Sequence, residues 1–241
     1  MKFDIISIFP EFFQSPLTYG MLRVALQKNI INVNITNPRD FTTDGVVDDY
    51  QFGGGGGMVF KPEPLTKAIN SVWTKKSTLI NLTPKGKRLN QRIVNKLTDN
   101  EHIVIICGRY KGIDERISDI FQPLHISIGD YVISGGEIGA LILMESITRL
   151  LPGVLGNRDS ANSDSFQGNL LEAPIYTRPY VFKRLKVPHV LRSGNHSMIA
   201  EWRRKEAMEM TLARKPHLLS EETFSKKDFE ILLEVLHGKN S

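Results

Sequence analysis

Three short apolar segments of this chain are each followed by a loop that contains glycine or proline. The segments are rich in β-branched residues and are separated by stretches with helical spacing. This pattern is typical of buried parallel strands, whose carboxyl-terminal loops converge on one crevice where ligands bind. The strands and their loops are Thr78–Leu82 with Thr83–Gly86, Ile103–Cys107 with Gly108–Gly112, and His125–Ile128 with Gly129–Glu137.

The glycines of these loops favour a ligand pocket. A backbone without Cβ atoms can bring its N–H and C=O groups close to a bound molecule. The alternative interpretation is three ordinary turns between strands and helices. The density of glycine and aromatic residues in the second and third loops favours the pocket.

Composition limits the class of protein. With 241 residues, 41% of them hydrophobic and 24% charged, the chain can bury a core as one large domain, or as one domain plus a small one. No apolar stretch reaches the roughly 18 residues of a membrane span, and Met1–Pro10 alternates like a strand without a signal-peptide pattern. The single cysteine excludes a disulfide framework and a zinc site with several cysteines. We therefore expect a cytoplasmic protein with no membrane partner.

Basic residues are concentrated in the last third of the chain. The whole chain has a net charge of +5, whereas residues 178–215 alone carry ten basic and three acidic residues, a local charge of +7. A basic surface attracts polyanions, but many basic surfaces are merely solvated. Charge alone therefore leaves contact with nucleic acid open.

The order of elements predicts an α/β domain followed by a smaller helical domain. Strands alternate with helices up to residue 150, which indicates a mostly parallel sheet flanked by helices. Residues 156–168 are polar and aperiodic, as in a linker or lid, and the remainder is basic and mainly helical. We expect a strand at Asn32–Thr36, a long loop at Phe41–Met58, and helices at Leu17–Lys28, Pro62–Lys75, Leu89–Leu97, Gly136–Leu150, Ser193–Ala213 and Glu221–Leu236, the last with a capping signal at Ser225 and Asp228.

Several common sites are absent from the sequence. No GxGxxG follows the first strand, and Pro84–Arg88 lacks the upstream glycine and the Ser/Thr of a phosphate-binding loop. The six histidines have no metal-ligand spacing. Cys107 ends an apolar strand, which favours a buried structural thiol over a nucleophile. What remains is a glycine-loop pocket, a polar lid and a basic helical domain.

Longer motifs occur in order along nearly the whole chain. They are YGMLR (Tyr19–Arg23), PRDFT (Pro38–Thr42), VDDY-x-FGGG-x-GM (Val47–Met58), LTPKGK (Leu82–Lys87), CGRYKGIDER (Cys107–Arg116), SIGDYVISGGE (Ser127–Glu137), PGVLG (Pro152–Gly156), DSF (Asp164–Phe166), YTRP (Tyr176–Pro179) and LRSGNH (Leu191–His196). With this series the chain resembles the TrmD family, the bacterial tRNA (guanine-N1)-methyltransferases of the SPOUT class.

The resemblance implies a fold, a reaction and an assembly. The fold is a mostly parallel sheet with a deep trefoil knot formed by the three glycine loops. The reaction transfers a methyl group from S-adenosylmethionine (SAM) to N1 of the guanine immediately 3′ of the anticodon, position 37 of tRNA. The assembly is a homodimer with composite active sites. The implied organisation is a SAM-binding domain at 1–155, a linker or lid at 156–170, and a helical tRNA-binding domain at 171–241.

The resemblance also assigns residues to the site. Asp164 matches the proposed general base and Arg149 its catalytic partner, and lid residues up to Asp164 come from the second subunit. By the resemblance, backbone groups of Ile128, Tyr131 and Ile133 are expected to bind the edge of the adenine. The side chains of Leu82 and Ile133 are expected to pack on its two faces. The whole implied SAM pocket is Leu82, Thr83, Pro84, Gly108, Tyr110, Gly112, Ser127, Ile128, Gly129, Tyr131, Ile133, Gly135 and Gly136.

The basic domain is expected to bind tRNA phosphates, which makes the affinity dependent on salt. The candidate residues are Arg178, Lys183, Arg184, Arg203, Arg204 and Lys205. Asp48 and Asp49 are expected to order the glycine-rich loop or to touch RNA, with simple solvent exposure as the alternative.

Three positions depart from the family pattern. Lys111 stands where the motif usually has a glutamate that is implicated in magnesium dependence, so a Mg²⁺ site is in doubt here. Gly56 replaces a common proline and Gly139 a common alanine, and both changes should loosen the local backbone.

Two other functions are kept as alternatives: a SPOUT methyltransferase for another RNA site, and a non-catalytic RNA-binding protein.

Overall fold

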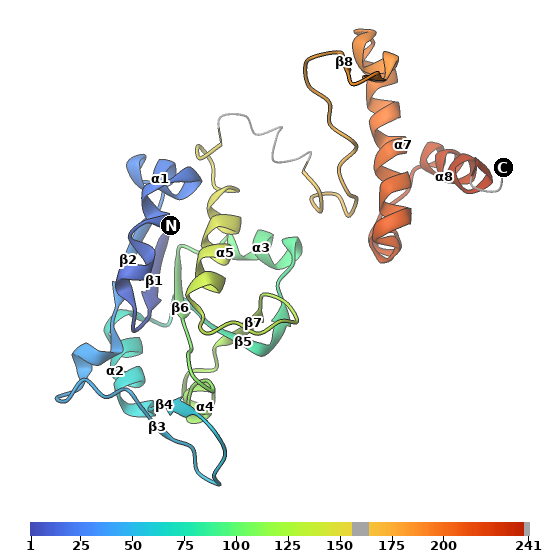
Figure 1. Cartoon of the computed structure of the whole chain (residues 1–241). Coiled ribbons are helices and arrows are strands. Elements are labelled where there is room, and N and C mark those ends of the chain that lie inside the picture. The colour runs from blue at the N-terminus through green and yellow to red at the C-terminus, as the bar shows by residue number, and fades with distance from the viewer. Residues whose placement is uncertain (156–163, 239–241) are drawn as a thin grey trace. The chain divides into compact units, whose positions relative to one another are not determined.

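The computed structural model describes residues 1–155 and 164–238, and the chain divides into two compact units (Figure 1). Unit 1 is Met1–Gly156 and unit 2 is Asn157–Ser241. Most of the predicted lid, residues 156–163, lies outside the described residues. No helix among the described residues combines the length and apolar composition needed to cross a bilayer.

A five-stranded sheet forms the centre of unit 1. Its strand order is β2-β1-β6-β5-β7, and every neighbouring pair is parallel. The sheet is therefore mostly buried on both faces, as the apolar segments predict. The strands are β1 (Lys2–Ile6), β2 (Asn32–Thr36), β5 (Thr78–Arg88), β6 (His102–Ile106) and β7 (Leu124–Ser127).

Helices cover both faces of this sheet. Apolar side chains of α1, α3 and α5 pack with Phe3, Ile5 and Ile105 on one face. Those of α2 and α4 pack with Ile6 and Val104 on the other face, because side chains alternate along a strand. The helices are α1 (Gly20–Gln27), α2 (Pro62–Val72), α3 (Gln91–Leu97), α4 (Arg116–Phe121) and α5 (Glu137–Thr148).

Two loops of the sequence-based description are wrong in part. Residues 83–86 were expected to leave the sheet, yet β5 continues through them. The pairing with β7 shifts there, so that Ile126 is the partner of both Leu82 and Lys87. The stretch expected as one long loop contains most of a hairpin, in which β3 (Asp48–Tyr50) pairs antiparallel with β4 (Met58–Phe60). The glycines form the tip of this hairpin, and β-forming residues flank them.

Some helix boundaries also differ from expectation. The first helix begins three residues late, because Gly20 has a φ of +61° that separates α1 from a 3-10 turn at Pro16–Thr18. The predicted cap at Ser225 is confirmed: its hydroxyl accepts the Asp228 N–H, and its N–H donates to the Asp228 carboxylate. The helix begins only after this cap.

In its described residues, unit 2 is built on two α-helices and a small hairpin. Its core joins α7 and α8 through Met208, Ile231 and Val235. Leu170, from the segment that precedes the helices, packs into the same core. The elements are β8 (Val181–Phe182), β9 (Leu185–Lys186), a 3-10 turn at His189–Arg192, α7 (His196–Arg214), a 3-10 turn at Pro216–Glu221, and α8 (Lys226–Gly238).

Candidate functional site

The three segments expected as glycine loops line one cavity of about 350 Å³ in unit 1, beside the middle of β5 and the carboxyl ends of β6 and β7. This volume lies in the range of small-molecule sites, roughly 300–1,000 Å³. All thirteen residues assigned to the cofactor line this cavity. They are Leu82, Thr83, Pro84, Gly108, Tyr110, Gly112, Ser127, Ile128, Gly129, Tyr131, Ile133, Gly135 and Gly136.

Glycine is required where two of the loops meet. A Cβ on Gly136 would lie 2.7 Å from the Cα of Cys107, and one on Gly135 would lie 2.5 Å from the Glu137 carboxylate. The first contact is with backbone, which cannot move aside as a side chain can. The Gly136 N–H donates to the Gly108 carbonyl at 2.9 Å, so the close approach is also a hydrogen bond.

A buried ion pair holds the same two loops together. Glu137 is 1% exposed and accepts hydrogen bonds from Arg109 Nε at 3.2 Å and from Ser7 Oγ at 2.8 Å. The Arg109 guanidinium also lies 4.3 Å from the centroid of the Phe9 ring. Because Glu137 starts α5, this pair ties the helix, the first strand's loop and both glycine loops into one framework.

Arg109 and Glu137 have no role that is evident from the sequence. Both stand inside the quoted motifs, but a motif does not show which members face each other. One signal was available: a carboxylate at the start of a strongly apolar helix needs a partner when it is buried. Arg109 also lines the cavity. Glu137 does not line it and acts on it through Arg109.

Cys107 has no nucleophilic character in this environment. Burial, followed by the nearby Glu137 carboxylate, raises the pKa of its thiol well above the usual value. The thiol is therefore neutral and inert at physiological pH. This agrees with the structural role expected for the residue.

The glycine-rich hairpin packs against the loop that carries Lys111. The Lys111 N–H donates to the Met58 carbonyl at 2.9 Å, and the Phe60 N–H donates to the Gly112 carbonyl at 3.0 Å. Burial and then the Asp48 carboxylate raise the pKa of Tyr110. Asp48 thus lies close to a tyrosine that lines the cavity, which favours its expected role in ordering this region.

Lys111 itself lines the cavity. Within residues 1–155 and 164–238, no three or more His, Cys, Asp or Glu side chains gather as a metal site would require.

The two expected catalytic residues belong to different units. Arg149 follows the last turn of α5, where its N–H donates to the Glu145 carbonyl at 3.1 Å. The cavity adjoins the other end of α5, because Gly136 and Gly139 line it. The helix rises by about 15 Å between Gly139 and Arg149, so Arg149 lies far along the helix from the cavity. Asp164 is in unit 2, where its carbonyl accepts the Gln167 N–H.

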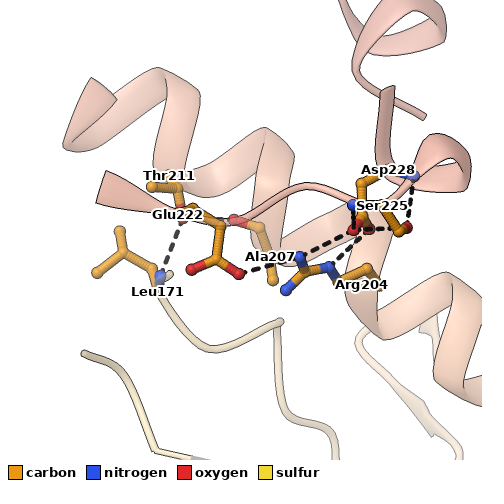
Figure 2. Close-up of polar contacts among 7 residues, drawn as sticks. All are labelled: Leu171, Arg204, Ala207, Thr211, Glu222, Ser225 and Asp228. Carbon is orange, nitrogen blue, oxygen red and sulfur yellow. Dashed lines mark hydrogen bonds and ion pairs between the residues drawn. The ribbon is translucent and has the colours of Figure 1, made fainter. Parts of the chain in front are cut away.

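The six expected RNA-binding cations fall into two groups. Arg178, Lys183, Arg184 and Arg203 are exposed and make no ion pair with the described residues. Arg204 is bound to Asp228 at 2.9 Å and to Glu222 at 3.1 Å, and Lys205 to Glu234 at 3.0 Å (Figure 2 shows the Arg204 contacts). Arg204 thus joins α7 to α8, and its charge is paired with two carboxylates.

Lys183 and Arg184 form the two-residue turn between β8 and β9. Their φ angles are 47° and 69°, as a type I′ turn requires at both central positions. Residues other than glycine adopt this backbone at a cost, and such strain is common at functional sites. The turn places two cations side by side at the tip of the hairpin.

Comparison with known proteins now identifies the family. A family model described as tRNA (Guanine-1)-methyltransferase TrmD matches residues 1–221. The chain belongs to the TrmD family. This match covers the cavity, Arg149, Asp164 and the basic hairpin, whereas α8 lies beyond it.

Individual TrmD-family relatives align over nearly their full length. A protein of Dictyoglomus turgidum is 46% identical over 98% of this chain and 96% of its own. A protein of Dehalococcoides mccartyi is 44% identical over 100% of this chain and 99% of its own. A protein of Christiangramia forsetii is 48% identical over 92% of this chain and 100% of its own. All three are named tRNA (guanine-N(1)-)-methyltransferase.

Proposed function

We propose that this protein transfers a methyl group from SAM to N1 of the guanine at position 37 of tRNA, immediately 3′ of the anticodon. One observation carries the proposal. In a chain of the TrmD family, all thirteen residues assigned to the cofactor line a single cavity.

The cavity suits SAM in shape and chemistry. Leu82 and Ile133 supply apolar surface for the two faces of the adenine, and the glycine loops supply backbone groups for its edge. Gly135 and Gly136 let the loops that line the cavity pack closely, because a Cβ on either would clash with Arg109 or with the backbone of Cys107. When bound, SAM supplies an electrophilic methyl group on a sulfonium centre. The ion pair of Arg109 and Glu137 keeps the cavity in shape before the cofactor enters.

Asp164 is proposed to take the proton that N1 of guanine loses as the methyl group arrives. A carboxylate within hydrogen-bond reach of N1–H can act as general base. A solvated aspartate has a pKa of about 3.9, so partial burial against the RNA would make it a stronger base. Arg149 is proposed to stabilise the negative charge that develops on O6, as a fixed guanidinium can.

We further propose that the working enzyme is a homodimer with composite active sites. About 15 Å of helix separates Arg149 from Gly139, the nearest residue of α5 that lines the cavity, and lid residues up to Asp164 are proposed to come from a second copy. Ile138 and Ile142 on α5 are 49% and 39% exposed, which is unusual for so apolar a helix. A second copy that covers this face would bury both side chains.

The trefoil knot and the three-part organisation of the chain are part of the same proposal. In support of the knot, Ile126 of β7 pairs with β5 on both sides of residues 83–86. Gly86 lies against the backbone of His125 and Ile126, so the chain passes very close to β7 at this point. We retain 1–155 as the SAM domain, 156–170 as the lid and 171–241 as the tRNA-binding domain.

The basic surface of unit 2 is proposed to hold the tRNA backbone. Arg178, Lys183, Arg184 and Arg203 are the candidates, since Arg204 and Lys205 are already paired with carboxylates. Each phosphate contact makes the affinity more dependent on salt. The logarithm of the association constant falls with the logarithm of the salt concentration, with a slope of about 0.7–0.9 per contact.

One assay tests the proposed function. Labelled SAM is incubated with the protein and a tRNA transcript that has guanine after the anticodon, beside a transcript with adenine there. We expect label only in the first. Label in both transcripts would indicate a methyltransferase for another RNA site, and label in neither would indicate a non-catalytic RNA-binding protein; each result would refute the proposal.

A further inference from the structure

The segment that carries Asp164 is fastened to the long helix of unit 2. The Leu171 N–H donates to the hydroxyl of Thr211 on α7 at 2.9 Å (Figure 2). Thr211 is fully buried, and its hydroxyl donates in turn to the Ala207 carbonyl at 2.6 Å. Both hydrogen-bonding roles of this hydroxyl are therefore used, and its position on the helix is fixed.

The segment is also closed on itself. Ser165 Oγ accepts the Glu172 N–H at 2.9 Å, and the Phe166 N–H donates to the Leu170 carbonyl at 2.9 Å. Leu170 is 8% exposed and packs in the core of unit 2. Residues 164–172 thus form a compact loop with one apolar anchor and one hydrogen-bonded anchor, both on unit 2.

We propose that Thr211 and Ser165 are positioning residues for the methyl transfer, because they make Asp164 a rigid part of unit 2. This inference rests on the proposed function. Asp164 and Arg203 line the same groove of about 680 Å³ in unit 2. The unit that grips the RNA then also carries the base, and the carboxylate reaches guanine N1 only when unit 2 has docked on the tRNA.

The expected effect is large because proton transfer depends steeply on geometry. A displacement of about 1 Å can cost roughly 100-fold in rate. Replacing Thr211 by valine keeps its size but removes the acceptor for the Leu171 N–H, so the loop loses its hydrogen-bonded anchor. The SAM cavity belongs to unit 1 and is not touched by this change.

The test compares Thr211→Val with Thr211→Ser in the full-length protein. For Thr211→Val we expect kcat at saturating tRNA and SAM to fall about tenfold, with KM for tRNA and Kd for SAM within about twofold of wild type. Thr211→Ser retains the hydroxyl and should restore kcat. A merely structural role would instead weaken tRNA binding together with kcat. An unchanged kcat, an equal loss in the serine variant, or a loss confined to KM for tRNA would each overturn the inference.

A second variant covers the case in which Thr211→Val does not fold. Ser165→Ala removes the acceptor for the Glu172 N–H at a position outside the core and should also lower kcat, whereas Ser165→Thr should not. The matched control is Ser220→Ala, which removes an exposed hydroxyl that bonds only the His217 carbonyl in the described contacts. It should leave kcat unchanged, and an equal loss in this control would overturn the inference.

Different results would refute the proposed function and the positioning inference. If wild-type protein does not label the guanine transcript, or if Asp164→Asn remains active, the proposed function or its base is wrong. If wild type is active and Asp164→Asn is not, while Thr211→Val and Ser165→Ala behave as wild type, only the positioning inference is wrong.

Discussion

Replacing Asp228 by asparagine is expected to destabilise unit 2 by about 2 kcal/mol at neutral pH. The Asp228 carboxylate accepts hydrogen bonds from Arg204 Nε at 2.9 Å, from Ser225 N at 2.9 Å and from Ser225 Oγ at 2.8 Å (Figure 2). Its side chain is only 11% exposed. Asparagine has the same shape but lacks the charge that Arg204 and the start of α8 require.

The magnitude follows from the acidity of the group. The hydrogen bonds from Arg204, which outweigh burial, lower the pKa of Asp228 from 3.8 to about 2. At about 1.36 kcal/mol for each pKa unit, the difference amounts to about 2 kcal/mol. Because the pKa is lower in the folded state, this stabilisation is complete well above pH 3.8 and is lost as the pH falls toward 2. At pH 3 about half of it should remain.

Urea unfolding followed by tryptophan fluorescence measures this difference. The chain has two tryptophans, Trp73 and Trp202, so the background substitution Trp73→Phe leaves a single reporter on α7 of unit 2. The matched control is Glu201→Gln, which breaks the exposed pair with Lys227 between the same two helices. Such pairs contribute about 0.2–1 kcal/mol. Equal losses for Asp228→Asn and Glu201→Gln at pH 7, or a loss that does not shrink at pH 3, would refute the reasoning.

Four further predictions concern the proposed enzyme. Gly136→Ala should weaken SAM binding at least tenfold by calorimetry, because a Cβ there would lie 2.7 Å from a backbone atom. Gly56→Ala places its Cβ in open space and should leave the SAM affinity unchanged. Equal SAM affinities of the two variants would contradict this prediction. Asp164→Asn should abolish turnover with normal SAM affinity, and retained turnover would remove its role as base. Ile142→Glu should convert a dimer to an inactive monomer in light scattering, and an intact dimer would place the interface elsewhere. If the Lys111 ammonium partly replaces a metal ion, activity should resist chelation, and Lys111→Glu should make it sensitive; complete loss in wild type would refute that idea.

The sheet and its cavity could be predicted from sequence because they depend on local patterns. Runs of β-branched residues specify buried strands, and parallel strands bring their carboxyl ends to one edge. The cap of α8 was predictable for the same reason, since Ser225 and Asp228 are three residues apart. The hairpin around the glycines was missed because its strands have only three residues each, too few to show an alternation.

Other parts of the site depend on residues that are far apart in the chain. Ser7 and Glu137 are separated by 130 residues, and Leu171 and Thr211 by 40, yet each pair is hydrogen-bonded. The basic run in α7 likewise gives no sign that Arg204 is neutralised, because its partners Glu222 and Asp228 come from the following segment. Sequence spacing does not encode which distant groups meet.

The sequence by itself determined the family, the parallel sheet and the glycine loops that follow β6 and β7, and it assigned the residues proposed to bind the cofactor. The strands and loops follow from short-range periodicity. The family and the cofactor residues follow from motifs that can be recognised without knowledge of the fold. Only the tertiary structure decided that Glu137 and Arg109 brace the cavity, that about 15 Å of helix separates Arg149 from it, and that the loop of Asp164 is anchored on Thr211. The physical reason is that burial and hydrogen bonding act between groups that folding brings together, whatever their separation along the chain.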